Sequence, residues 1–269
     1  GVFDLVSARI ADRMGFPALY MTGYGVVASS FGLPDAGLAS YTEMVDRVKT
    51  IAAGTLTPLI ADGDTGYGGL LNVQRTVRGY EQAGAVAIQL EDQKIPKKCG
   101  HTPNRRVIPV DDMVAKIRVA VAARESENFL VIARTDARTQ YGLAEAIGRG
   151  QAFAKAGADV VFVEAPESVD EMIEICREID GPLMANMVNG GKTPLLSAEE
   201  LKDLGYQIVI FPGTAFLAAG SAVQSVYQHL KATGSSRGLP TPLYDFEEFN
   251  RLMGFEEVWA FEKKWTDPS

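Results

Sequence analysis

The sequence predicts an α/β protein built as a (β/α)8 TIM barrel. Eight short apolar runs alternate with longer helical patterns, and many of the runs end in polar residues. Near-continuous apolar runs are typical of parallel strands that are buried on both faces, and their alternation with helices is typical of βαβ units. A chain of 269 residues has the length of one barrel or of two small domains, and eight strand–helix units favour the barrel.

The expected strands are spaced along the first 211 residues. They are residues 1–3, 18–21, 57–61, 85–90, 129–133, 159–163, 182–185 and 207–211. The helical patterns lie near 4–14, 41–53, 72–83, 110–124, 142–156, 168–179 and 197–204. Ser197 is a plausible helix cap, and Gly84 and Gly157 end helices directly before a strand. We expect the barrel to occupy residues 1–231.

Residues 232–269 are surplus to a barrel. They comprise a linker that runs to Pro240 and a helix-like segment from Leu243 to Trp265. That segment carries seven aromatic residues, which are Tyr244, Phe246, Phe249, Phe255, Trp259, Phe261 and Trp265. A helix packed on its own barrel would account for them. Because linker and helix are additional to the barrel, the sequence favours an arm at an oligomer interface, with its last helix swapped between subunits.

Composition excludes several classes of function. The net charge is −8, with 26 Lys and Arg against 34 Asp and Glu, which disfavours nucleic acid as a partner. No run approaches the ~18 apolar residues of a membrane span, and no signal peptide is visible. Two cysteines are too few for a disulfide framework or a structural zinc site, which predicts a cytoplasmic protein. Gly1 is not an initiator methionine, so the numbering leaves room for a native segment before it.

Polar residues follow six of the expected strands. They are Thr22-Gly23, Asp62-Gly63-Asp64, Glu91-Asp92, Arg134-Thr135-Asp136, Glu164 and Asn186. The C-terminal ends of barrel strands converge on one face, where active sites are built. Isolated buried charges are costly, so these groups should pair with one another or bind an ion. The pattern therefore predicts a functional site at this rim.

Three of these residues are typical of a hard-cation site. Asp62, Asp64 and Glu91 offer only oxygen ligands on an acidic rim, which favours Mg2+ or Mn2+ over zinc. An alternative is that one aspartate caps the next helix, and Asp64 could cap the glycine-rich turn over residues 65–69. A dinucleotide fingerprint at residues 23–28 is a false lead, because the next strand ends in an acidic residue much more than ~20 residues further on.

A long loop after the fourth expected strand carries the second chemical signal. Cys99 lies among Lys97, Lys98 and His101, a cationic setting that suits a nucleophile or a general acid/base. Gly100 gives the loop freedom to close over a substrate. The other cysteine, Cys176, and the other histidine, His229, fall in helical patterns and are expected to be structural.

Taken together, these motifs resemble the isocitrate lyase and phosphoenolpyruvate mutase superfamily. The resemblance rests on Asp62-Gly63-Asp64-Thr65-Gly66-Tyr67-Gly68, Glu91-Asp92-Gln93 and Lys97-Lys98-Cys99-Gly100-His101. Supporting matches are Thr22-Gly23, Gly32-Leu33-Pro34-Asp35, Arg134-Thr135-Asp136, Glu164-Ala165 and Asn186-Met187. The matches run in order from about residue 20 to about residue 215, and as a set they are specific.

The resemblance implies a barrel whose last helix is exchanged, in a homotetramer that is a dimer of dimers. It also implies Mg2+, with Asp62 and Asp64 nearest the ion, Glu91 acting through water and Asp35 supporting that shell. A small anionic 2-hydroxy or 2-oxo acid would be the substrate. Its carboxylate would be held by Thr22, Gly23, Tyr24 and Arg134, with Glu164 and Asn186 lining the other side of the pocket.

Within the superfamily, the cysteine loop is typical of the lyase branch. Cys99 would act as general acid/base in cleavage of a carbon–carbon bond of an alkylmalate-type acid, with Lys97, Lys98 and His101 orienting the thiol. Thr102 stands where methylisocitrate lyases often have an arginine, which favours a smaller 2-alkylmalate over methylisocitrate. Oxaloacetate hydrolysis or decarboxylation and phosphonomutase chemistry are the alternatives. An intact metal pair and cysteine loop disfavour a catalytically silent barrel.

Overall fold

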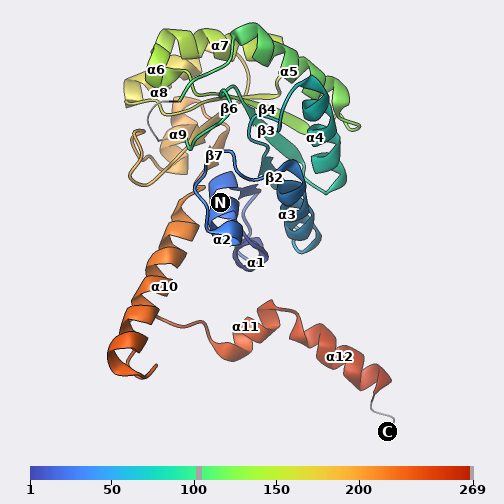
Figure 1. Ribbon diagram of the computed structural model, residues 1–269, viewed down its shortest axis with the longest axis vertical. Helices are drawn as coiled ribbons and strands as arrows, with labels where there is room; N and C mark the ends of the chain where they lie inside the picture. The colour runs from blue at the N-terminus through green and yellow to red at the C-terminus, as the bar shows by residue number, and fades with distance from the viewer. Residues whose placement is uncertain (101–104, 267–269) are drawn as a thin grey trace. The chain divides into compact units, whose positions relative to one another are not determined.

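The computed structural model describes residues 1–100 and 105–266. Its seven parallel strands form one sheet in chain order, with helices around the outside (Figure 1). The strands are β1 (Leu19–Met21), β2 (Leu59–Asp62), β3 (Ala87–Glu91), β4 (Leu130–Thr135), β5 (Val160–Val163), β6 (Leu183–Asn186) and β7 (Ile208–Ile210). Each strand pairs with its neighbour along the chain, as right-handed βα repeats require. The prediction of a TIM-type α/β barrel is confirmed.

The N-terminal residues lie where an eighth strand would close the barrel. The run 1–3 forms only an isolated parallel bridge, in which Val2 pairs with Met21. Val2 N donates to Tyr20 O at 2.8 Å, and Thr22 N donates to Val2 O at 3.0 Å. On the other side, a Cβ added to Gly1 would lie 2.6 Å from Phe211 O, just after β7. The segment is too short to extend this pairing into a strand, so the barrel is nearly closed.

Ten helices belong wholly or partly to the barrel among the described residues. They are α1 (Leu5–Asp12), α2 (Gly23–Phe31), α3 (Tyr41–Ala53), α4 (Leu70–Gln82), α5 (Val110–Ala123), α6 (Arg138–Tyr141), α7 (Leu143–Lys155), α8 (Val169–Glu178), α9 (Ala198–Leu204) and α10 (Thr214–Thr233). The expected helices did not include α2 or α6, and of α10 only the stretch around His229 was expected to be helical. Helix α2 starts on glycine-rich sequence that has low helix propensity, but the Thr22 side chain caps it by accepting from Gly25 N.

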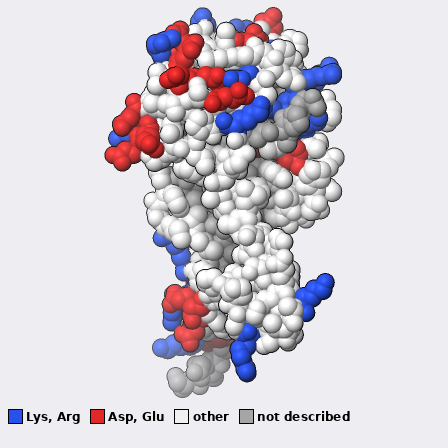
Figure 2. Space-filling view, turned by 90° about the vertical axis from the view of Figure 1, so that its left-hand side faces the viewer, with Lys and Arg blue, Asp and Glu red and all other residues white. Residues whose placement is uncertain are grey.

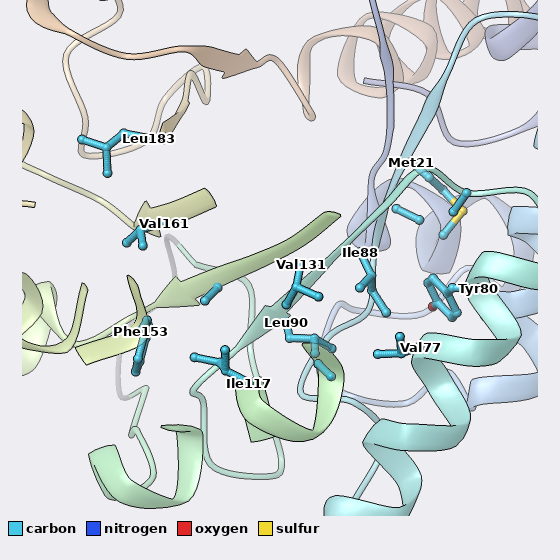
Figure 3. Close-up of a cluster of buried hydrophobic side chains, with 14 of the residues drawn as sticks. Met21, Val77, Tyr80, Ile88, Leu90, Ile117, Val131, Phe153, Val161 and Leu183 are labelled. Atoms are coloured by element: carbon cyan, nitrogen blue, oxygen red, sulfur yellow. The ribbon is translucent and has the colours of Figure 1, made fainter. Parts of the chain in front are cut away.

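Two apolar layers fill the barrel unit. The inner layer comprises side chains that point to the barrel axis, among them Tyr20, Ile132 and Phe162. The outer layer lies between the strands and the helices. Figure 3 shows part of it, with Leu90 and Val131 of the strands near Ile117 of α5 and Val77 of α4. Because both faces of each strand are covered, the rim is where polar side chains can meet.

The chain divides into two compact units, Gly1–Phe216 and Leu217–Ser269. The second contains most of α10, then α11 (Phe246–Leu252) and α12 (Phe255–Trp265). The single helical segment expected over 243–265 is therefore wrong in detail. Gly254 adopts a left-handed φ of 90° and separates the two helices. The boundary expected at residue 231 and the helix swap both stay predictions. No described helix is long and apolar enough to cross a membrane.

Candidate active site

The polar residues that follow the strands are brought together at one rim. On one side, Gly23 N after β1 donates to Asp62 Oδ2 at the end of β2, at 3.2 Å. On the other side, Arg134 of β4 lies 3.5 Å from Glu91 Oε2 of β3 and 3.3 Å from Glu164 Oε2 after β5. Neighbouring strands thus exchange contacts through their C-terminal residues, as the sequence pattern predicted.

Asp62 and Asp64 are held by the backbone of the turn that carries them. Asp62 Oδ1 accepts from Asp64 N at 3.0 Å and from Gln89 Nε2 at 3.4 Å. Asp64 has a φ of 48°, an uncommon conformation for a residue with a Cβ. Burial raises the pKa of Asp64 to about 6, although Lys97 opposes that rise. Holding two buried carboxylates together is unfavourable unless positive charge is close.

Lys97 supplies positive charge to this acidic side. Its Nζ lies 2.5 Å from Asp35 Oδ1 and 2.6 Å from Asp64 Oδ1, and the side chain is almost fully buried. Burial alone would lower the pKa of Lys97, but Asp64, Glu91 and Asp35 raise it well above the usual value for lysine. Lys97 is therefore an ammonium ion that joins the cysteine loop to the acidic turn.

Three buried oxygens on the rim lack hydrogen bonds within the described residues: Asp64 Oδ1, Glu91 Oε1 and Asn186 Oδ1. Asp64 Oδ1 nevertheless lies 2.6 Å from the Lys97 ammonium. Glu91 Oε1 and Asn186 Oδ1 are the buried oxygens that suit a hard cation or the water molecules around it, and with the neighbouring carboxylates this donor set fits Mg2+. In residues 1–100 and 105–266, however, no three Asp, Glu, His or Cys side chains converge as a ready-made metal site. The ligand set Asp35, Asp62, Asp64 and Glu91 stays a prediction.

Arg134 dominates the other half of the rim. It binds Asp136 through two hydrogen bonds, Nε to Oδ2 and Nη2 to Oδ1, both at 2.9 Å. Its guanidinium carbon lies 5.3 Å from the centre of the Phe162 ring. Burial raises the pKa of Glu91 well above its usual value, and Arg134 opposes that rise. A fixed guanidinium with a planar fork suits recognition of a carboxylate.

Glu164 and Asn186 lie side by side, and Glu164 lies next to Arg134; that they line the other side of the pocket stays a prediction. Asn186 Nδ2 donates to Glu164 Oε2 at 3.0 Å, and Ala165 N donates to Glu164 Oε1 at 2.9 Å. Both side chains are buried. The pair places the Glu164 carboxylate next to Arg134, with the Asn186 amide bonded to it.

The cysteine loop lies directly against the arginine side. A Cβ added to Gly100 would lie 2.3 Å from Arg134 Nη2 and 2.9 Å from Glu164 Cδ, so only glycine permits this approach. Cys99 N donates to Asp35 O at 3.1 Å. The Gln93 side chain clamps Lys98, donating to its O at 2.7 Å and accepting from its N at 2.9 Å. Cys99 is half-buried. The expected site residue His101 lies outside the described residues.

The three residues expected around the substrate carboxylate near α2 have different surroundings. Thr22 is buried and caps α2, and Gly23 is bonded to Asp62 through its backbone N–H. Tyr24 is 39% exposed, and its ring packs on Phe216 with centroids 5.1 Å apart. A direct role in substrate binding stays a prediction for all three.

Behind Arg134 lies a network of buried charged residues that the sequence did not predict. Asp92 Oδ2 accepts from Thr135 Oγ1 at 2.7 Å and from Arg149 Nη1 at 3.1 Å, and its Oδ1 accepts from Asp136 N at 2.9 Å. Burial raises the pKa of Asp92 to about 6. Asp92 and Asp136 were visible in the strand-end pattern, whereas Arg149 in α7 gave no signal beyond its charge.

Comparison with known proteins gives the same family as the motifs. The family model described as phosphoenolpyruvate phosphomutase matches residues 1–231. A 2,3-dimethylmalate lyase of Eubacterium barkeri is 46% identical over 266 residues, covering 99% of this chain and 92% of the relative. A 2-methylisocitrate lyase of Aeropyrum pernix is 42% identical over 264 residues, covering 98% and 84%.

Solved structures agree. A crystal structure of 2,3-dimethylmalate lyase, described as a PEP mutase/isocitrate lyase superfamily member, has a TM-score of 0.92 at 38% identity, covering 98% of this chain and 88% of that one. A phosphonopyruvate hydrolase in complex with oxalate and Mg2+ has a TM-score of 0.87 at 31% identity, covering 99% and 93%. The chain belongs to the phosphoenolpyruvate mutase/isocitrate lyase superfamily, whose similar members include carbon–carbon lyases.

Proposed function

We propose that the protein is a Mg2+-dependent carbon–carbon lyase that cleaves a 2-hydroxy acid of the alkylmalate type into a 2-oxo acid and a carboxylate. One observation carries the proposal. Gly100 lies against Arg134 and Glu164, and Cys99 precedes it in the same loop, which supports a thiol that acts near the arginine that suits a substrate carboxylate. A thiol held next to a carboxylate-binding site can deliver a proton to a carbanion formed there.

Different residues act on the two fragments of the substrate. Arg134 binds the carboxylate of the part that becomes the 2-oxo acid, and Asn186 and Glu164 line the same side. The substrate hydroxyl gives its proton to a carboxylate of the rim as the carbon–carbon bond breaks, and the bonding electrons pass to the leaving fragment as an enolate. Cys99 protonates that fragment. Mg2+, when bound beside Asp62 and Asp64, supplies Lewis-acid stabilisation of negative oxygen.

The favoured substrate is a 2-alkylmalate such as 2,3-dimethylmalate. The 46% identical relative bears the name of that activity, and it is matched over nearly its full length. Thr102 adds no cation for a third carboxylate. Methylisocitrate is the next substrate to consider, because a 42% identical relative is a 2-methylisocitrate lyase.

A phosphonate or oxaloacetate reaction is the second candidate. The matching family model is that of phosphoenolpyruvate phosphomutase, and the similar structures include phosphonopyruvate hydrolase and oxaloacetate acetylhydrolase. The cysteine loop supports carbon–carbon cleavage over the phosphonate reaction, because a positioned proton donor is what a departing carbanion requires.

The decisive experiment measures release of a 2-oxo acid in the presence of Mg2+. We would compare 2-methylmalate, 2,3-dimethylmalate, methylisocitrate, oxaloacetate and phosphonopyruvate. Cys99→Ala should lower kcat on the best substrate by about 10²- to 10⁴-fold, the usual contribution of a general acid. Cys176→Ala is the matched control, since Cys176 lies on α8, and it should keep full activity. Turnover of phosphonopyruvate alone would refute the lyase assignment.

A further inference from the structure

Arg105 is a buried cation at the back of the substrate side. It retains only 3% of its exposure. Its Nη1 donates to Asp136 Oδ1 at 2.7 Å, and its Nη2 donates to Thr139 Oγ1 of α6 at 2.5 Å. Burying a guanidinium is expensive and requires a compensating partner, which here is Asp136.

Asp136 is shared between two arginines. Its Oδ1 accepts from both Arg105 Nη1 and Arg134 Nη2, while its Oδ2 accepts from Arg134 Nε. The two hydrogen bonds from Arg134 to the two oxygens of Asp136 fix the plane of the Arg134 guanidinium. Arg105 binds the same Oδ1 as Arg134 and so helps to hold the carboxylate in place, and the backbone N–H of Asp136 donates to Asp92 Oδ1.

The charges around Arg134 explain why a second arginine matters. Arg134 faces three carboxylates, those of Asp136, Glu91 and Glu164. On its own, it would be outnumbered, and an anionic substrate would meet net negative charge. Arg105 adds a second positive charge at the Asp136 carboxylate. Because the charge of Asp136 is then shared, more of the field of Arg134 remains for a substrate carboxylate.

We propose that Arg105 is a positioning residue for substrate binding. Through Asp136 it orients Arg134 and keeps the charge of Arg134 available to the carboxylate of a 2-oxo acid. Arg105 does not touch the substrate in this account. The inference rests on the proposed function, because it assigns Arg134 to the carboxylate.

The test uses oxalate as the probe. Oxalate is a small dianion of two joined carboxylates, and it mimics the enolate of a 2-oxo acid. Calorimetry would measure oxalate binding to the full chain with Mg2+. Arg105→Gln removes the charge and should weaken oxalate binding by about 10- to 100-fold, as expected for loss of a buried charged partner. Arg105→Lys keeps the charge and should bind within about 5-fold of wild type. In turnover, the loss should fall on KM more than on kcat.

Thr139→Val is the matched control. It removes the other hydrogen bond of Arg105 without changing any charge, so oxalate binding should stay within about 3-fold of wild type. Mn2+ binding without oxalate, measured by electron paramagnetic resonance, should be the same in all variants. Equal losses in Thr139→Val and Arg105→Gln would show that packing of Arg105, and not its charge, matters, which overturns the proposal.

Two further outcomes distinguish failure of the role of Arg105 from failure of the proposed function. If Arg105→Gln binds oxalate as tightly as wild type, the inference is wrong while the lyase proposal stands. If wild type binds no oxalate and releases no 2-oxo acid, the proposed function fails, and the inference fails with it. Arg105→Met replaces Arg105→Gln should the latter not fold. If neither the Arg105→Gln nor the Arg105→Met variant folds, Arg105 serves the fold, and its proposed role in substrate binding is overturned.

Discussion

At the scale of single residues, the rim has an excess of acid. Seven carboxylates meet four basic groups among its described residues: Asp35, Asp62, Asp64, Glu91, Asp92, Asp136 and Glu164 against Lys97, Arg105, Arg134 and Arg149. The imbalance is greatest around Asp62 and Asp64, where Lys97 is the neighbouring cation. A bound divalent cation would correct it, whereas the Arg134 side, with three arginines against four carboxylates, is closer to balance.

Gln89 connects the barrel interior to Asp62 and offers a stability test. Tyr20 Oη donates to Gln89 Oε1 at 2.8 Å, and Gln89 Nε2 reaches Asp62 Oδ1. Gln89→Leu should lower the free energy of unfolding by about 1–3 kcal/mol, because it removes a hydrogen bond from each of two buried polar groups, the Tyr20 hydroxyl and Asp62 Oδ1. Urea denaturation measures this. Gln82→Leu, at an exposed site, should change it by less than about 0.5 kcal/mol. Equal effects of the two substitutions would contradict the proposed connection.

The two cysteines should differ in reactivity. Burial raises the pKa of the Cys176 thiol to about 11, although a hydrogen bond with Tyr206 opposes the rise. At pH 8, only about 0.1% of Cys176 would be thiolate, the form that reacts. Iodoacetamide at pH 8 should therefore modify Cys99 first, as followed by peptide mass spectrometry. Cys99→Ala should lose the fast phase and Cys176→Ala should retain it. Faster labelling of Cys176 than of Cys99 would contradict this assignment of the reactive thiol.

At the scale of elements, a pair between α6 and α8 predicts a pH dependence. Arg138 Nε donates to Glu171 Oε2 at 2.8 Å, and Nη2 lies 2.5 Å from Oε1. The hydrogen bond from Arg138 lowers the pKa of Glu171 below its ordinary 4.5. The stabilisation is thus complete above pH 4.5 and is lost as the pH falls through the lower pKa of the folded state.

Glu171→Gln tests this pair. Because the pair is at the surface and partly screened, the substitution should cost only about 0.5 kcal/mol at pH 7, and the difference should shrink as the pH falls below the ordinary pKa of 4.5. Thermal unfolding at a series of pH values measures it. Glu174→Gln on the same helix is the control and should show no such trend. A difference that persisted undiminished at pH 3 would mean that the ion pair is not its source.

Local sequence predicted most elements but not the exceptions. Apolar runs located all seven strands, because strands buried on both faces leave an unbroken apolar pattern. Helix α2 was missed, since its glycines are poor helix formers and a cap from Thr22 outweighs them. The tail was read as one helix, and Gly254 breaks it. In each case a single residue overrode the pattern around it.

The site shows the same division between local and distant information. The strand-end rule gathered Asp62, Glu91 and Arg134 correctly, because every barrel strand points the same way. It could not show that Lys97 would pair with Asp35, 62 positions away, or that Arg105 would share Asp136. Those contacts depend on where loops come to rest, which no periodicity in the sequence records.

At the scale of the whole molecule, the C-terminal unit carries apolar surface that a soluble monomer would rarely expose. Its exposed large side chains include Tyr227, Leu243, Phe246, Phe261 and Trp265, with Phe246 77% exposed. In the face shown by Figure 2, much of the surface of the lower part bears neither acidic nor basic side chains. Apolar patches of this kind mark interaction sites. A homotetramer in which this unit contacts a partner subunit therefore remains our prediction.

Two aromatic residues of α12 provide the final test. Phe261 is 62% exposed and Trp265 is 65% exposed, and their rings lie 6.5 Å apart. If they are buried between subunits, the double substitution Phe261→Glu and Trp265→Glu places charges in an apolar contact. At micromolar concentration, light scattering should then show a tetramer for the wild type and dissociated subunits for the variant. Glu257→Gln on the same helix should leave the mass unchanged. Because each barrel unit has its own core, the dissociated variant should still unfold cooperatively. A wild-type monomer at that concentration would instead mean that these rings serve no contact between subunits.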